Sequence, residues 1–274
     1  MIKEVERLSE KMYNTRYYPM TLVEHLLETQ SMEPYLILGV VRPERAQISL
    51  QFSITFSHFA SGFEGEATVS ILRNQVAVWV KSEHEWDVDD LRNLVKNIVQ
   101  DHLAIVGYLK GYAYDLELTR VLNQSRGIDN VFGIDIPCLA KRGESIDLRA
   151  AFPELSKRME GPNGVYLNRC LTDLSLAMKH GDDTGFYCYR AIESLRLHCA
   201  VLNGLIDAPK LTQWEKFREV SGADEETLCF IKLAADQPRH GNISVVKDED
   251  RVNLFTKTWD IVDRYLNSVQ SILL

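Results

Sequence analysis

The fold of the C-terminal half is decided by residues 183–203, DTGFYCYRAIESLRLHCAVLN. The apolar residues of this segment recur at alternating spacings of four and three: Cys188, Ile192, Leu195, Cys199 and Leu202. This periodicity predicts a helix with one buried side. The same segment carries Arg190, Glu193 and Arg196. Charges within a core-forming helix need either a partner or a chemical role.

Further amphipathic helices are predicted on both sides of this segment, and no strand is predicted after Phe152. The predicted helices are residues 152–159, 163–179, 212–220, 224–237 and 248–274. In the last of them the apolar residues again alternate spacings of three and four: Val252, Phe255, Trp259, Val262, Leu266, Val269 and Leu273. This pattern predicts a core helix of the bundle or, alternatively, a seam with a second protomer.

The N-terminal half is predicted to form an antiparallel meander. Residues 47–58 alternate apolar and polar side chains, which predicts a strand with one buried face. The other predicted strands are residues 35–41, 66–72, 75–81 and, at the edge of the sheet, 131–136. Arg73-Asn74 is predicted to be a tight turn. Two short helices, residues 4–12 and 21–28, are predicted before the first strand.

A long helix, residues 88–122, is predicted to cover the apolar face of the sheet. Aspartates at its start suit a helix N-terminus, where negative charge is favoured. Its predicted buried stripe is Leu91, Leu94, Ile98, Ile105, Leu109, Tyr112 and Leu116. Gly107 and Gly111 indicate a close approach to the sheet or a bend.

These elements predict an α+β protein with two domains. The N-terminal domain, residues 1–145, is an antiparallel sheet covered by a long helix. The C-terminal domain, residues 150–274, is an all-α helical bundle. The linker is placed at the polar residues 141–148, within several residues.

Composition narrows the range of functions. The chain is 45% hydrophobic and 26% charged, typical of a globular protein. Residues 1–150 hold 16 Lys and Arg against 21 Asp and Glu, and the remaining residues hold 15 against 18. This acidic balance argues against broad, non-specific nucleic-acid binding. No run of eighteen apolar residues is present, so we predict no membrane partner and a cytoplasmic location.

The five cysteines are Cys138, Cys170, Cys188, Cys199 and Cys229. No two of them have CxxC spacing, and most lie among apolar neighbours, so they are predicted to be small buried hydrophobes. Glycine-rich nucleotide-binding motifs are also absent. We therefore predict no metal and no cofactor.

A second polar cluster, Arg239-His240-Gly241, ends a later predicted helix. Together with residues 189–196 and the order of the helices, it resembles the HEPN superfamily, the all-helical nucleotide- and RNA-binding bundles of prokaryotic toxins and defence proteins. More narrowly, residues 160–274 are similar to bacterial proteins labelled as methylamine-utilisation accessories. The resemblance implies a homodimer that binds RNA or a nucleotide, in some members a metal-independent ribonuclease.

In catalytic members, the resemblance implies a cleft between two copies of an Arg-(four to six residues)-His motif. Glu193 would orient Arg239, which would hold the scissile phosphate. His240 would act as general acid or base. Arg190 and Arg196 would be binding residues.

The motif spacing of the catalytic members is absent here, because residues 233–235 are Leu-Ala-Ala. A structural interpretation therefore stands beside the catalytic one. Gly241 suits the left-handed position that ends a helix, where the cations Arg239 and His240 are favoured. The charges of residues 183–203 would then form an ion-pair network at the edge of the core.

Two functional hypotheses follow. In the first, the chain is an RNA- or nucleotide-binding, defence-related protein whose N-terminal domain is a sensor or partner-binding module. In the second, it is a non-catalytic interaction or accessory protein whose polar cluster is structural.

Overall fold

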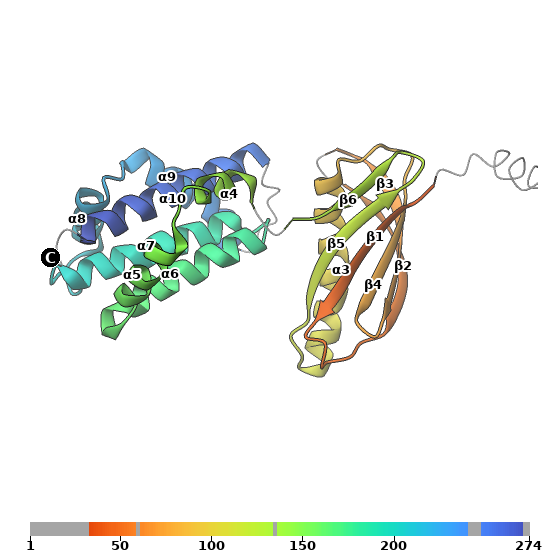
Figure 1. The fold of residues 1–274 in the computed structure, drawn as a ribbon, viewed down its shortest axis with the longest axis horizontal. Coiled ribbons are helices and arrows are strands. Elements are labelled where there is room, and N and C mark those ends of the chain that lie inside the picture. The colour runs from red at the N-terminus through yellow and green to blue at the C-terminus, as the bar shows by residue number, and fades with distance from the viewer. Residues whose placement is uncertain (1–32, 59–60, 134–135, 241–247, 271–274) are drawn as a thin grey trace, which may run out of the picture. The chain divides into compact units, whose positions relative to one another are not determined.

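The computed structural model describes residues 33–58, 61–133, 136–240 and 248–270. It confirms the α+β class, with an antiparallel sheet followed by a helical region (Figure 1). The chain divides into two compact units, Met1–Phe132 and Gly133–Leu274, here called the sheet unit and the helical unit. The helices predicted at residues 4–12 and 21–28 lie outside the described residues.

The sheet unit holds six strands, all antiparallel, in the order β2-β3-β4-β1-β5-β6. They are β1 (Tyr35–Arg42), β2 (Leu50–Ser57), β3 (Glu64–Leu72), β4 (Gln75–Lys81), β5 (Asp115–Asn123) and β6 (Ile128–Val131). The predicted meander holds only for β2, β3 and β4. The first strand instead lies between β4 and β5, and its nearly continuous apolar sequence suits a central strand.

The predicted helix 88–122 is wrong at its C-terminal end. Helix α3 (Val88–Lys110) begins at Asp87, whose side chain accepts hydrogen bonds from two backbone N–H groups of the first turn. It ends at Gly111, which has a left-handed φ of 69°. Residues 115–119 alternate polar and apolar side chains, a period of two that is typical of a strand, and they form the first part of β5.

The buried stripe of α3 also differs from the predicted one. Its buried residues are spaced by four: Leu91, Val95, Val99, Leu103 and Gly107. A spacing of four advances about 40° more than a full turn at each step, so the buried line slants as the helix crosses the sheet. Two members of the predicted stripe, Ile105 and Leu109, are therefore exposed, and a third, Tyr112, lies beyond the end of the helix and is also exposed.

The turn predicted at Arg73-Asn74 is confirmed, with positive φ at both residues. The side chain of Asn74 is buried and holds three backbone groups. Its Oδ1 accepts from the N–H of Ile48 (2.9 Å), and its Nδ2 donates to the carbonyls of Val41 (2.9 Å) and Pro43 (3.3 Å). The β3–β4 turn is thereby joined to the end of β1 and to the segment between β1 and β2.

The boundary between the units differs from the predicted linker at residues 141–148. The edge strand β6 occupies Ile128–Val131, earlier than the predicted 131–136, and the division into units follows Phe132. Part of the predicted linker lies in helix α4 (Pro137–Gly143), whose Arg142 pairs with Asp263. This segment is therefore part of the helical unit.

In the helical unit, the structure confirms each predicted helix to within a few residues. After α4 come α5 (Leu148–Arg158), α6 (Gly161–Lys179), α7 (Thr184–Leu202), α8 (Lys210–Ser221), α9 (Glu225–Arg239) and α10 (Asp248–Gln270). Helix α7 contacts α6, α8, α9 and α10, so it is the central helix of the unit. The last helix packs through Phe255, Val262 and Val269 as predicted, whereas Val252 is exposed. None of the described helices is long and apolar enough to cross a membrane.

Candidate functional site

Helix α7 is buried on most of its circumference, so its polar residues cannot all point to solvent. Gly185 lets it approach α9 closely: a Cβ at this position would lie 2.5 Å from the carbonyl oxygen of Ala234. Contact across this point brings the end of α9, with Arg239, toward the first half of α7. The residues singled out in the sequence therefore lie in one region of the helical unit, although in different environments.

Arg190 faces α6 and pairs with Asp173, a residue that the sequence analysis did not single out. The guanidinium nitrogen of Arg190 lies 3.0 Å from Oδ1 of Asp173, and Nε of Arg169 lies 3.2 Å from Oδ2. The Asp173 side chain is 1% exposed. Burial raises its pKa, and the charge of Arg169 lowers it in part.

The guanidinium of Arg190 also lies over the rings of Phe186 (5.1 Å) and Tyr187 (5.6 Å). Such cation–π contacts favour a cation that is partly removed from water. A carboxylate and two aromatic rings thus surround Arg190 and fix it against its own helix and α6. Asp173 is marked in the sequence only by its place on the buried side of α6, between Cys170 and Ala177.

Arg196 faces α8 and is buried. Its guanidinium donates a hydrogen bond to Oε1 of Gln213 and lies 5.3 Å from the ring of Trp214. Gln213 in turn donates from Nε2 to the carbonyls of Leu205 (3.1 Å) and Ile206 (3.0 Å), in the loop before α8. Arg196 and Gln213 therefore connect α7 to that loop. Burial lowers the pKa of Arg196, and the charge of Glu193 partly offsets this.

Glu193 lies on the same face of α7 as Tyr189 and Arg196, because these residues are spaced by four and three. Its Oε1 is 3.4 Å from Nζ of Lys210. The ring of Tyr189 stacks on Trp214, with 6.3 Å between centroids. The pKa of Tyr189 is raised mainly by burial and next by Glu193, whereas Arg196 and Arg239 lower it.

Arg239 and His240 lie at the C-terminal end of α9, and both are exposed. The backbone N–H of His240 donates to the carbonyls of Asp236 (3.2 Å) and Gln237 (3.1 Å), which completes the last turn. Neither side chain makes a hydrogen bond or an ion pair within the part of the chain that the structure describes. Gly241, predicted to follow the helix end, lies outside that part.

The structure thus brings Glu193 and Arg239 to the surroundings of Tyr189. It places Arg190 against α6 and Arg196 against α8. His240 is at the surface next to Arg239, with no described contact to Glu193. The described residues include no group of three His, Cys, Asp or Glu placed to hold a metal ion.

A second buried polar pair, also not anticipated from the sequence, joins α7 to α10. Nδ1 of His198 lies 2.7 Å from the hydroxyl of Tyr265, and both side chains are buried. Burial lowers the pKa of His198 and raises that of Tyr265. Burial therefore favours the neutral ring of His198, which forms a hydrogen bond with Tyr265 within the core.

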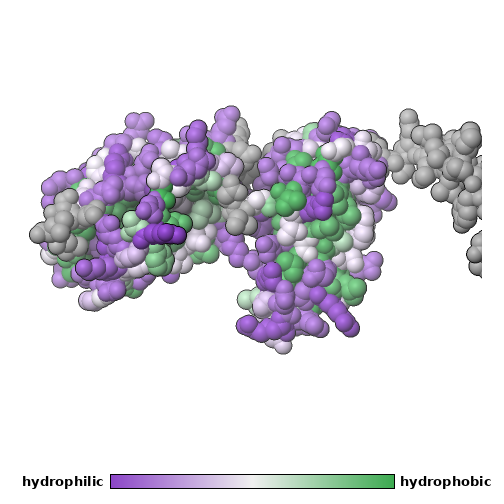
Figure 2. All heavy atoms as spheres, in the orientation of Figure 1, coloured by the Kyte–Doolittle hydropathy of each residue, from purple (hydrophilic) through white to green (hydrophobic). Residues whose placement is uncertain are grey.

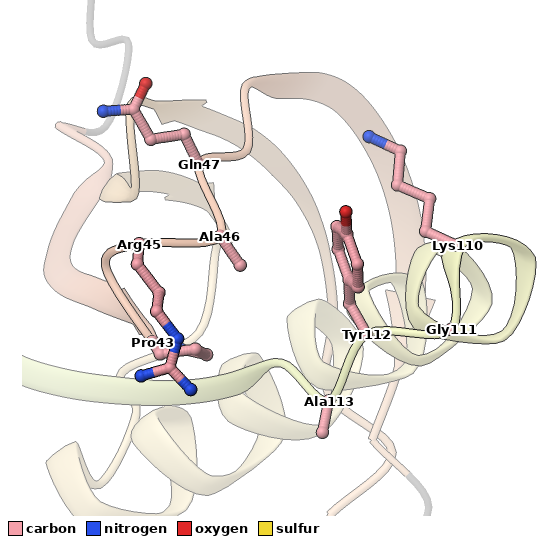
Figure 3. A pocket seen from close by; sticks show the side chains of 8 residues that line it. All are labelled: Pro43, Arg45, Ala46, Gln47, Lys110, Gly111, Tyr112 and Ala113. Atoms are coloured by element: carbon pink, nitrogen blue, oxygen red, sulfur yellow. The ribbon is translucent and has the colours of Figure 1, made fainter.

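A pocket of about 620 Å³ lies in the sheet unit, between the segment that follows β1 and the end of α3 (Figure 3). It is lined by Pro43, Arg45, Ala46, Gln47, Lys110, Gly111, Tyr112 and Ala113. Its lining includes two cations and no carboxylate. This pocket was not predicted from the sequence, because its two walls are more than sixty residues apart.

Comparison with known proteins bears on each unit separately. No curated protein and no solved structure gives a significant match. Two family models do match: residues 35–132 match the N-terminal domain, and residues 152–270 the C-terminal domain, of a domain of unknown function, DUF8168. The chain therefore matches both domains of one family, DUF8168, in their order along the sequence.

Proposed function

We propose that the helical unit is a non-catalytic interaction module whose internal charges hold its helices together. The observation that carries this proposal is the buried position of Arg196, bonded to Gln213 and stacked on Trp214. An arginine that binds a phosphate needs its guanidinium donors directed at the ligand. The donors of Arg196 lie in the interior of the unit. In this proposal the chain is a cytoplasmic accessory protein, with the sheet unit as a second partner-binding module.

Exposed apolar residues on the helical unit support a role in protein interaction. Leu148 and Phe152, one turn apart on α5, are 73% and 71% exposed. Val165 on α6 is also exposed. Large apolar groups at a protein surface often mark sites where another protein binds. The polar residues inside and the apolar residues outside thus support the same proposal.

The proposal is tested by measuring RNA cleavage and thermal stability on the same variants. Wild type, Arg196→Met and Arg239→Ala are each incubated with a short single-stranded RNA without metal, and their thermal unfolding is measured. We expect no cleavage by any of them and a lower unfolding temperature for Arg196→Met alone. Lys232→Ala, an exposed cation on α9, is the matched control for Arg239→Ala. Cleavage by wild type that Arg239→Ala abolishes would overturn the proposal.

A second candidate function is RNA or nucleotide contact at the end of α9, as the HEPN resemblance implies. It is favoured by the exposure of Arg239 and His240 at the end of α9. An exposed arginine can hold a phosphate through two parallel hydrogen bonds.

This second candidate predicts a salt-dependent affinity for a fluorescent single-stranded RNA, measured by anisotropy. Arg239→Ala would weaken binding and reduce the salt dependence by about one phosphate contact. Lys232→Ala would change binding less if the site is specific. Equal losses in the two variants would indicate a general electrostatic attraction and exclude a site at Arg239.

A further inference from the structure

The outer face of α3 carries a stripe of exposed apolar side chains. Ile105, Tyr108 and Leu109, here called the outer stripe, are 57%, 88% and 74% exposed. Their spacings of three and four place them together on one side of the last two turns. Figure 2 shows groups of hydrophobic residues on the visible face of the sheet unit.

The opposite face of these turns is already covered. Leu103 and Gly107 are buried, and a Cβ on Gly107 would lie 2.5 Å from the carbonyl oxygen of Tyr112. The end of α3 is therefore apolar on both of its sides, whereas a helix at a protein surface normally has one polar side. Within the described part of the sheet unit, α3 is the only helix, so no other helix of this unit covers the outer stripe.

Charges of opposite sign lie at the two ends of the outer stripe. Asp101, four residues before Ile105 and on the same face of α3, is exposed. Beyond Leu109, the pocket contributes Arg45 and Lys110 on opposite sides of its opening (Figure 3). Among the described residues, none of these three forms an ion pair. One end of the stripe is therefore acidic and the other basic.

We propose that the outer stripe binds a second copy of this chain, with the two α3 helices antiparallel. A two-fold axis on the outer side of the helix, at the level of residue 107, would set Ile105 against the partner's Leu109. It would also bring Asp101 over the partner's Arg45 and Lys110. A two-fold interface is self-complementary, so each apolar and each charged contact occurs twice. This inference concerns the sheet unit and is independent of the role proposed for the helical unit.

The charge order selects the second copy among the possible occupants. An acidic end followed by an apolar centre and a basic end is complementary to itself when it is reversed. Burying the outer stripe in this way removes three large side chains per copy from water, which provides the driving force. The opposed charges fix the direction of the helices more than they add affinity.

The first test is the oligomeric state of the full chain, measured by sedimentation velocity over a range of concentrations. We expect a wild-type dimer and a monomeric Tyr108→Glu/Leu109→Glu variant, with a dissociation constant raised at least about a hundredfold. Leu72→Glu is the matched control, because Leu72 is an exposed leucine of the same unit and lies outside the stripe. It should remain dimeric.

A monomeric wild type overturns the proposal, because the outer stripe would then be covered by another part of the same chain or by water. A dimer that persists in the Tyr108→Glu/Leu109→Glu variant also overturns it. The substituted positions are exposed, so the circular dichroism spectrum should stay unchanged and the comparison remains valid.

The second test uses the charges to check the antiparallel direction. Asp101→Lys should raise the dissociation constant about tenfold at low salt, because it places like charges together. Combining it with Arg45→Glu and Lys110→Glu should restore wild-type affinity. A combined variant no tighter than Asp101→Lys would overturn the antiparallel arrangement.

Discussion

In the sheet unit, apolar side chains such as Tyr108 and Leu109 are exposed to solvent, whereas in the helical unit the charged Asp173 and Arg196 are buried. The sequence draws attention to the second group, because charges in a core helix are unusual. In the structure, those charges have partners inside the helical unit. The exposed apolar side chains have no partner that covers them among the described residues of the sheet unit. A charged residue in a core helix, although unusual, therefore need not belong to a surface that binds a partner.

The largest loss of stability should come from removing the buried carboxylate of Asp173. Asp173→Ala leaves Arg190 without its buried partner and creates a small cavity, so we expect the free energy of unfolding to fall by about 3 kcal/mol. Urea denaturation measures the change. Asp101→Ala, which removes an exposed carboxylate from α3, should change the stability by less than about 0.5 kcal/mol. Similar values for the two variants would contradict the role given to Asp173.

The second-largest loss of stability should come from adding a methyl group where α7 and α9 approach closely. Gly185→Ala places a methyl group 2.5 Å from the backbone of Ala234, so the helices must separate. Overpacking of this kind costs about 2 kcal/mol. Gly143→Ala is the control, since no atom outside its immediate surroundings lies within 4 Å of an added Cβ. If both variants unfold at the same urea concentration, the close approach does not contribute to the free energy of unfolding.

Removing the guanidinium that holds Gln213 should have a smaller effect. Arg196→Met keeps much of the side-chain volume and removes the hydrogen bond, for an expected loss of about 1.5 kcal/mol. The exposed Arg149, changed to Met, provides the comparison. A double-mutant cycle with Gln213→Leu should show a coupling energy. Additive losses would mean that the two residues act separately.

The smallest effect should appear as a dependence on pH. Burial lowers the pKa of His198 below its ordinary value of 6.5, so the folded protein favours the neutral ring. Its contribution to stability is complete above pH 6.5 and declines as the pH falls toward the lowered pKa, because the unfolded chain takes up a proton first. The stability difference between wild type and His198→Gln should therefore shrink on acidification. A difference that is constant from pH 8 to pH 5 would contradict this account.

Local periodicity was enough to predict much of the fold. The alternation in residues 47–58 and the apolar spacing in residues 183–203 each span several residues of one element, and both elements form. The end of α3 was missed because the charges and leucines of residues 115–122 fit either a helix or a strand over so short a stretch. Gly111, with its left-handed φ, decides between them in the structure.

The candidate site was less predictable, because its partners come from other helices. Asp173, Gln213 and Tyr265 each contact a residue of α7 from a distance of 17 to 67 positions along the chain. Spacing within one helix identifies which side chains share a face, but it does not identify the helix that packs against that face. The close approach of α9 to α7 at Gly185 and Ala234 is likewise a feature of packing that spacing within one helix does not show.

The buried amide of Asn74 has a consequence for engineering the sheet unit. Hairpin turns are usually the easiest places to insert a tag or a foreign peptide. The β3–β4 turn is an exception, since any lengthening would pull this side chain away from Ile48, Val41 and Pro43 at once. The turn between β5 and β6 is held in a similar way, because Oδ1 of the buried Asn123 accepts hydrogen bonds from the hydroxyl of Ser125 and the backbone N–H of Arg126. An insertion there would disturb these bonds as well, so neither turn is a suitable place for a tag.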